Sequence, residues 1–243
     1  MSEQTTWYGF KAEEFTFEDR KAVIVFPDKA NEKKSWTLKM EYWGAFPETE
    51  IELVKRGFHA VYLQNHFRWA TKEDCDAKAR FSAYISEKYG LNKKCVLVGM
   101  SCGGAHSVNF TGFYPDLVQC MFIDAPVLNF VSIPGKRNAH NNPVWENEFS
   151  KAYPGITRAG LLNFDNHPIS KAPIIIENKI PILMVYGTDD TVVEYDENGL
   201  MLEELYADHP GLLTVMKRNM QGHHPHGFPT NPGVIADWIE EHI

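Results

Sequence analysis

The stretch Gly99-Met100-Ser101-Cys102-Gly103 lies between an apolar run, 94–98, and a run of small residues that can begin a helix. A serine between glycines at such a strand-to-helix turn is typical of a nucleophile elbow, in which the sharp turn exposes the hydroxyl. The free N–H groups at the start of the helix then favour an oxyanion beside it. Because the five-residue pattern alone often arises by chance, its position between a strand and a helix makes Ser101 a candidate nucleophile.

An acidic turn follows a second run that is typical of a buried strand, 180–186. Asp189 and Asp190 both lie in this turn, at the carboxyl end of the predicted strand. A carboxylate beside a catalytic histidine fixes the tautomer of the imidazole and stabilises its charged form. Either aspartate could therefore support a serine nucleophile.

Three histidines, His223, His224 and His226, lie in the loop after a third predicted strand, 212–216. Histidine titrates at about pH 6.5, so it can accept the proton of a serine and return it to the leaving group. Serine, acid and histidine occur here in the chain order of α/β-hydrolases. Each follows a predicted strand, where catalytic groups collect in open α/β sheets. We therefore expect a triad of serine, acid and histidine.

The histidine loop could alternatively bind zinc. However, neither an H-E-x-x-H pattern nor a suitably spaced acidic partner accompanies the histidines. The four cysteines, Cys75, Cys95, Cys102 and Cys120, also lack the spacing of a metal site. We expect no metal and no other cofactor.

Acyl transfer also requires N–H groups that stabilise the oxyanion. One is expected to be that of Cys102, the residue after the nucleophile, and the second comes from a loop after an earlier strand. The predicted strand 22–26 is followed by Pro27 and Asp28. We therefore expect Asp28 near the second position, although the His-Gly run of lipases is absent there.

Strand and helix patterns alternate along the chain, which predicts an α/β fold with a mostly parallel central sheet covered by helices. The stretch 7–17 predicts an antiparallel hairpin at the edge of this sheet. Between 127 and 179 the alternation breaks, and we expect a cap or lid inserted after the sixth main strand; the alternative is a surface excursion that its aromatic residues pin to the core. Further predicted strands are 22–26, 59–63 and 119–123, and predicted helices are 47–56, 73–89 and 232–242.

Composition indicates one enzyme-sized domain spanning 1–243. The chain has 243 residues, 44% of them hydrophobic, and a net charge of −8 without a basic cluster. These values argue against nucleic acid or a membrane as a partner. The polar N-terminus lacks the basic start and apolar core of a signal peptide, so we expect a cytoplasmic protein. A homo-oligomer is possible, and the sequence leaves the oligomeric state open.

The chain resembles the α/β-hydrolase superfamily over nearly its whole length. More narrowly, it is similar to bacterial carbohydrate esterases of the acetylxylan type. Two positions depart from that group: Cys102 stands where a larger, often basic residue is expected, and Glu194 replaces the proline that commonly follows the acid turn. The narrower similarity lies in Trp36, 42–47, 56–62, 101–104, 124–126, 167–169, 187–198 and 222–227.

This resemblance guides the choice among the triad candidates. The turn of such hydrolases places the acid three residues after a glycine, here Gly187, which selects Asp190. A Gly-His pair after the last strand favours His223, whereas a His-Gly-Phe ending favours His226. The distance to the final helix favours His223, with His226 as the alternative.

We expect a small-molecule ester as the substrate, such as an acetylated sugar. Trp36 and Trp69 could stack on a sugar ring, although an aromatic residue in a chain with 44% hydrophobic residues is usually part of the core. Arg68 follows a predicted strand and could hold a carboxylate or hydroxyl, or lie in a solvated loop. A peptidase or amidase would use the same triad, and a binding protein without activity could share the fold; the intact set of serine, acid and histidine argues against the latter.

Overall fold

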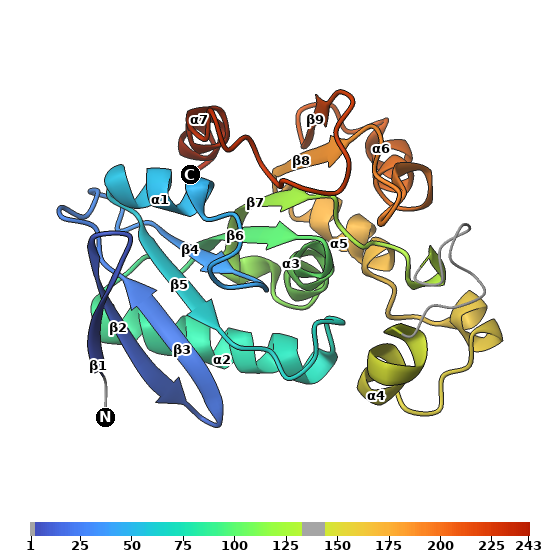
Figure 1. Cartoon of the computed structure of the whole chain (residues 1–243), viewed down its shortest axis with the longest axis horizontal. Helices are drawn as coiled ribbons and strands as arrows, with labels where there is room; N and C mark the ends of the chain where they lie inside the picture. The colour runs from blue at the N-terminus through green and yellow to red at the C-terminus, as the bar shows by residue number, and fades with distance from the viewer. Residues whose placement is uncertain (1–2, 133–143) are drawn as a thin grey trace.

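The computed structural model describes residues 3–132 and 144–243, and within them the strands form one continuous sheet (Figure 1). The spatial order of the strands is β1-β2-β3-β5-β4-β6-β7-β8-β9. Their bounds are β1 Glu3–Trp7, β2 Phe10–Phe17, β3 Arg20–Val25, β4 Trp36–Lys39, β5 His59–Leu63, β6 Cys95–Met100, β7 Val118–Asp124, β8 Ile182–Gly187 and β9 Leu213–Arg218.

Strand direction divides the sheet into two parts. From β5 through β4 and β6 to β9, every neighbouring pair is parallel, whereas β1, β2 and β3 are antiparallel and extend one edge. The carboxyl ends of β4 to β9 therefore meet at one edge of the sheet. This is the edge at which α/β proteins bind their ligands.

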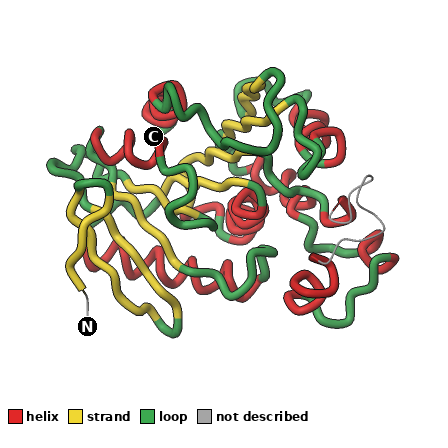
Figure 2. Tube along the Cα trace, viewed as in Figure 1, coloured by secondary structure: helices red, strands yellow, loops and turns green. Residues whose placement is uncertain are grey.

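Helices cover both faces of the sheet: in Figure 2, helical segments (red) lie on either side of the strands (yellow). Along β6, Val96 and Val98 point to the face covered by α1 and α7, while Leu97 points to the face covered by α2, α3, α5 and α6. Because both faces are buried, the inner strands consist almost entirely of apolar residues. The helices are α1 Glu48–Lys55, α2 Lys72–Tyr89, α3 Cys102–Phe113, α5 Ala172–Glu177, α6 Gly199–Tyr206 and α7 Gly233–Glu241.

These findings confirm the predicted α/β fold, and the predicted helices 47–56, 73–89 and 232–242 are present with ends that agree to within one residue. Among the described helices, none combines the length and the apolar character needed to cross a membrane.

Strand β4 was not predicted from the sequence. It contains Lys39, a residue that is rare inside a buried strand. Lys39 is 1% exposed, and its Nζ lies 2.5 Å from Oε1 of Glu50 in α1. Since β4 lies between β5 and β6, it is this strand, and not the predicted strand 22–26, that borders the strand leading to Ser101.

The segment 127–179 follows β7, and its short helices among the described residues up to 171 lie at the side of the sheet to which β6 and β7 point (Figure 1). Its described part contains short helices, and Phe130, Phe149 and Leu161 pack in one apolar cluster with Cys102 and Ala105 of α3. The segment therefore lies beside the start of α3. Its short helices are Phe130–Ser132, Trp145–Phe149, α4 Ser150–Ala152, Ala159–Asn163 and Pro168–Lys171.

The two glycines around Ser101 differ in the space that surrounds them. A Cβ on Gly99 would lie 2.3 Å from the Gly103 carbonyl oxygen and 2.3 Å from Ser107 Oγ, whereas a Cβ on Gly103 would meet nothing closer than the Glu41 Cβ at 3.3 Å. We expect Gly99→Ala to lower the free energy of unfolding by about 1–3 kcal/mol through overpacking.

Gly103→Ala is the matched control and should stay within about 1 kcal/mol of the wild type, because alanine also favours the helix. Urea unfolding of both variants measures the difference. Equal midpoints for the two variants would contradict this account of the turn.

Candidate active site

Ser101 is the single residue between the end of β6 and the start of α3. Its backbone has φ 52° and ψ −118°, a strained conformation for a residue with a side chain. The Ser101 N–H donates to the Asp124 carbonyl oxygen at 2.9 Å, and the Ser101 carbonyl oxygen accepts the N–H of Val127 at 3.0 Å. These bonds hold the strained turn, which places the side chain at the amino end of α3.

Asp190 follows β8 and is held by its own turn. Its Oδ1 accepts the N–H groups of Val192 at 2.8 Å and Val193 at 2.9 Å, while its Oδ2 lies 2.7 Å from Nδ1 of His223. Burial alone would raise the pKa of the Asp190 carboxyl, but the hydrogen bond and charge of His223 and the two N–H groups outweigh it and lower the pKa. Asp190 is therefore ionised at neutral pH, whereas Asp189 beside it is exposed.

The pairing with Asp190 determines the state of the His223 ring. An ionised carboxylate only accepts hydrogen bonds, so Nδ1 of His223 must carry the proton that it donates. In the neutral ring, Nε2 then keeps a lone pair that can accept a proton. This is the tautomer that a general base requires.

His226 is paired with a different carboxylate. Its Nδ1 lies 2.9 Å from Oδ1 of Asp124, a fully buried residue at the end of β7. The same carboxylate accepts a bond from Arg218 at 2.9 Å and from the Gly227 N–H at 2.5 Å. Asp124 thus anchors the histidine loop, and the structure brings His223, not His226, to Asp190.

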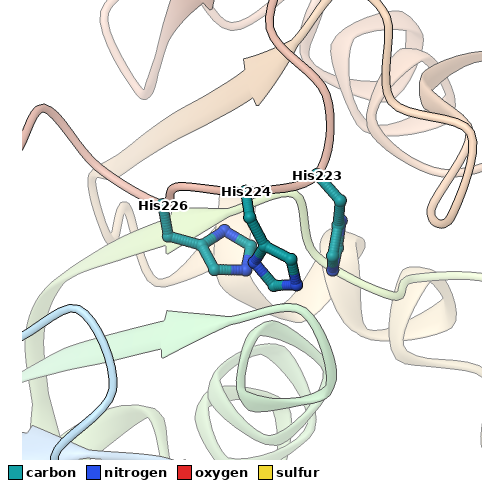
Figure 3. Close-up of side chains that lie close together, drawn as sticks. All are labelled: His223, His224 and His226. Atoms are coloured by element: carbon teal, nitrogen blue, oxygen red, sulfur yellow. The ribbon is translucent and has the colours of Figure 1, made fainter.

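His224 lies between the other two histidines and is exposed on one side (Figure 3). Its ring stacks on Phe46 with centroids 5.3 Å apart, and the three imidazole centroids are 4.7–4.9 Å from one another. Burial, followed by the charges of His223 and His226, lowers the pKa of His224.

Ser101 and His223 line the same cavity, which has a volume of about 300 Å³. Arg68 also lines it, and Arg68 Nε donates to Oε2 of Glu148, a residue of the segment 127–179, at 2.5 Å. Among the described residues, its lining consists of Tyr42, Ala45, Phe46, Arg68, Met100, Ser101, Val192, His223, His224 and His226.

Cys102, the residue after Ser101, is a second potential nucleophile by its chemistry. Burial raises the pKa of its thiol to about 11. The thiol is therefore protonated at neutral pH, and a thiol is a much weaker nucleophile than a thiolate.

The structure contradicts the placement of Asp28 and Trp36 at the site. Strand β3 is antiparallel to β5, so its last residue, Val25, pairs with Ala60 near the start of β5. The loop that holds Asp28 therefore lies at the edge opposite to Ser101. Trp36 pairs with His59 at that same edge and is fully buried, and its Nε1 donates to the Asn92 carbonyl oxygen.

Trp69 lies closer to the site but does not line the cavity. Its ring packs edge-on against Phe149 and Phe130 with centroids 5.5 Å and 6.4 Å away, and it is only 4% exposed. Trp69 therefore supports the neighbouring Arg68, whose guanidinium lies 5.2 Å from the Trp69 ring, and it is not available to stack on a substrate.

Two aromatic residues of the cavity, Tyr42 and Phe46, were not assigned to the site from the sequence. Both lie in the loop after β4, the strand that was missed. The signal that could have found them is the short run Trp36-Thr37-Leu38, whose aromatic and β-branched residues favour a strand before the loop.

Comparison with known proteins agrees with this architecture. The family model of the prolyl oligopeptidase family matches residues 59–241. No curated protein matches the sequence significantly.

Solved structures with low sequence identity share the fold. A putative dipeptidyl aminopeptidase IV from Bacteroides ovatus superposes with a TM-score of 0.72 at 11% identity, covering 100% of this chain and 36% of that one. The chain thus spans about a third of that protein. An S-formylglutathione hydrolase from Agrobacterium tumefaciens gives 0.71 at 15% identity, covering 99% of this chain and 98% of that one.

A monoacylglycerol lipase from Paleococcus ferrophilus gives a TM-score of 0.61 at 15% identity, covering 92% of this chain and 99% of that one. At these identities the structures show a common α/β-hydrolase fold. With the family match over most of the chain, they show that the protein is a serine hydrolase of this fold. The chain belongs to the prolyl oligopeptidase family.

Proposed function

We propose that the protein hydrolyses small carboxylic esters, with Ser101 as nucleophile, His223 as general base and Asp190 as the acid that orients His223. The observation that carries this proposal is the 2.7 Å contact between Asp190 Oδ2 and His223 Nδ1, beside a cavity that His223 and Ser101 line together. Serine, histidine and aspartate in these relations are what nucleophilic acyl transfer requires.

In the first half of the reaction, Nε2 of His223 takes the proton of the Ser101 hydroxyl as its oxygen attacks the ester carbonyl. The imidazolium that forms is stabilised by Asp190, and it then gives its proton to the leaving alcohol. In the second half, His223 activates a water molecule that attacks the acyl-enzyme and releases the acid.

The oxyanion of the tetrahedral intermediate would be stabilised by two backbone N–H groups. One belongs to Cys102 at the first position of α3. We assign the second to the loop after β4, at Tyr42, because this loop follows the strand next to β6 and lines the cavity. This assignment replaces that of Asp28.

The dimensions of the cavity support a small substrate. Its volume of about 300 Å³ lies at the lower end of the range for ligand sites. Tyr42 and Phe46 offer apolar surface, while Arg68 offers hydrogen-bond donors to a hydroxyl or carboxylate. A small acyl ester of a polar alcohol, such as an acetylated sugar, combines these properties.

Ester and peptide hydrolysis use the same triad, and proteins of both kinds share this fold. The monoacylglycerol lipase and the S-formylglutathione hydrolase cover nearly all of this chain and are themselves covered almost completely. We favour an ester substrate because the cavity would hold one small acyl group more readily than an extended peptide.

Ser101→Ala should lower kcat for p-nitrophenyl acetate by at least about 10⁴-fold, because the covalent route is lost. The variant should also no longer react with a fluorophosphonate probe. Circular dichroism checks that the fold is intact. If the variant kept more than about a tenth of the wild-type rate, Ser101 could not be the nucleophile.

Single replacements of His223 and His226 should affect different properties, the first activity and the second stability. His223→Ala should lower kcat by several orders of magnitude with little change in the urea midpoint. His226→Ala should lower the free energy of unfolding by about 1–3 kcal/mol, because Asp124 loses a buried partner. Loss of kcat confined to His226→Ala would reverse the assignment of the base.

Acetyl esters should be hydrolysed with a higher kcat/KM than octanoyl esters of the same alcohol, because the cavity is small. A series of p-nitrophenyl esters of increasing acyl length measures this preference, and aminoacyl p-nitroanilides measured in parallel test the peptidase alternative. A kcat/KM that rises steadily with acyl length would contradict the small-acyl proposal, and faster cleavage of the anilides would contradict the ester proposal.

A further inference from the structure

The three histidines have a property that hydrolysis with one general base does not use. His223, His224 and His226 come from the same short loop, and Figure 3 shows their rings side by side. Each can offer one ring nitrogen such that all three nitrogens lie within 4.8 Å of one another. Three neutral imidazoles are the ligand set of an open zinc site, and because Zn–N bonds are about 2.0–2.1 Å long, small rotations of the rings must bring the nitrogens closer together on binding.

The hydrogen bonds of two of these rings match those of metal ligands. Nδ1 of His223 is bound to Asp190 at 2.7 Å, and Nδ1 of His226 is bound to Asp124 at 2.9 Å. Metal-binding histidines almost always donate their second N–H to such a partner, which fixes the tautomer and makes the other nitrogen more basic. Both rings therefore keep Nε2 free for a metal ion.

The third ring is also placed to bind. His224 is stacked on Phe46, which restrains its orientation, and it lines the cavity together with the other two. The charges around the cluster are balanced: Arg218 is paired with Asp124, and Arg68, on the wall of the cavity, is paired with Glu148. Two carboxylates, Asp190 and Asp124, lie directly behind the ligands.

We propose that His223, His224 and His226 bind a divalent transition metal ion through their ring nitrogens, with Zn²⁺ as the best fit, and that this ion reversibly inhibits the hydrolase. Zn²⁺ suits three imidazoles and leaves a fourth position for water in the cavity. The inhibitory part rests on the proposed role of His223, whereas the binding part does not.

Inhibition follows from the shared lone pair. The Nε2 lone pair that would take the proton of Ser101 is the one that would bind the metal, so His223 cannot do both at once. Binding requires no oxidant or reductant and breaks no covalent bond. Removal of the ion by a chelator therefore restores the free base.

Binding is tested apart from catalysis in the Ser101→Ala protein, which retains all three histidines. Isothermal titration with ZnCl₂ should show one ion per chain. Adding His224→Ala should weaken this binding on the order of 100-fold. Loss of a residue that only hydrogen-bonds to a metal ligand already weakens binding by about 10–100-fold, and loss of a ligand itself should cost at least as much. His209→Ala, which removes an exposed histidine outside the cluster, is the matched control and should leave the binding unchanged.

Inhibition is tested in the wild-type enzyme with p-nitrophenyl acetate over a range of free Zn²⁺. Activity should fall as the site fills and return with EDTA. In His224→Ala, the half-inhibitory concentration relative to the metal-free rate of that variant should rise by a similar factor, whereas His209→Ala should behave as the wild type.

The outcomes separate the two proposals. Absence of Zn²⁺ binding, or binding that His224→Ala does not weaken, overturns the metal site. Binding that leaves activity unchanged overturns the inhibition. Absence of ester hydrolysis in the metal-free wild type contradicts the proposed function instead, and the calorimetric result still decides the metal site.

Discussion

The carboxylate of Asp124 is the constraint on which the arrangement of the site depends. It is fully buried at the end of β7, where it accepts hydrogen bonds from His226, Arg218 and the Gly227 N–H. The carbonyl oxygen of the same residue accepts the N–H of Ser101. Arg218 and Asp124 form a buried ion pair, and removing one partner of such a pair costs about 3–5 kcal/mol. Together with the hydrogen bonds, this pair holds the turn at Ser101, the end of β9 and the histidine loop in fixed relative positions.

Two pairs of carboxylate and histidine with similar geometry have different surroundings. Asp124 is neutralised by Arg218, and its histidine anchors a loop. Among the described residues, Asp190 is stabilised by N–H groups of its own turn and by His223, and that histidine lines the cavity. Both histidines line the cavity, but the charge of Asp124 is already neutralised by Arg218, so it is on His223 that a positive charge would be stabilised best beside a substrate.

The segment 127–179 contributes to the site although it lies far from Arg68 in the sequence. Its Glu148 holds Arg68 at the cavity wall, and its Phe130 and Phe149 pack on Trp69, which supports the same arginine. A charged side chain held by an ion pair and an aromatic ring loses much of its freedom, so it presents its donors to the cavity in a defined direction.

Local patterns were enough to predict the α/β fold, most of its elements and the turn at Ser101. The choice of Asp190 and His223 came from the resemblance to α/β-hydrolases, and these two residues lie 2.7 Å apart in the structure. They failed where the answer depended on strand direction and long-range pairing. Asp28 was misplaced because β3 is antiparallel to β5. Trp36 was misplaced because β4 was not predicted: the charge of Lys39 argues against a buried strand, and it is neutralised by the contact with Glu50 of α1. Likewise, His226 is paired with Asp124, more than a hundred residues away in the chain. Periodicity records which face of an element is buried, but only the assembled sheet decides which edge each loop reaches and which distant charge it meets.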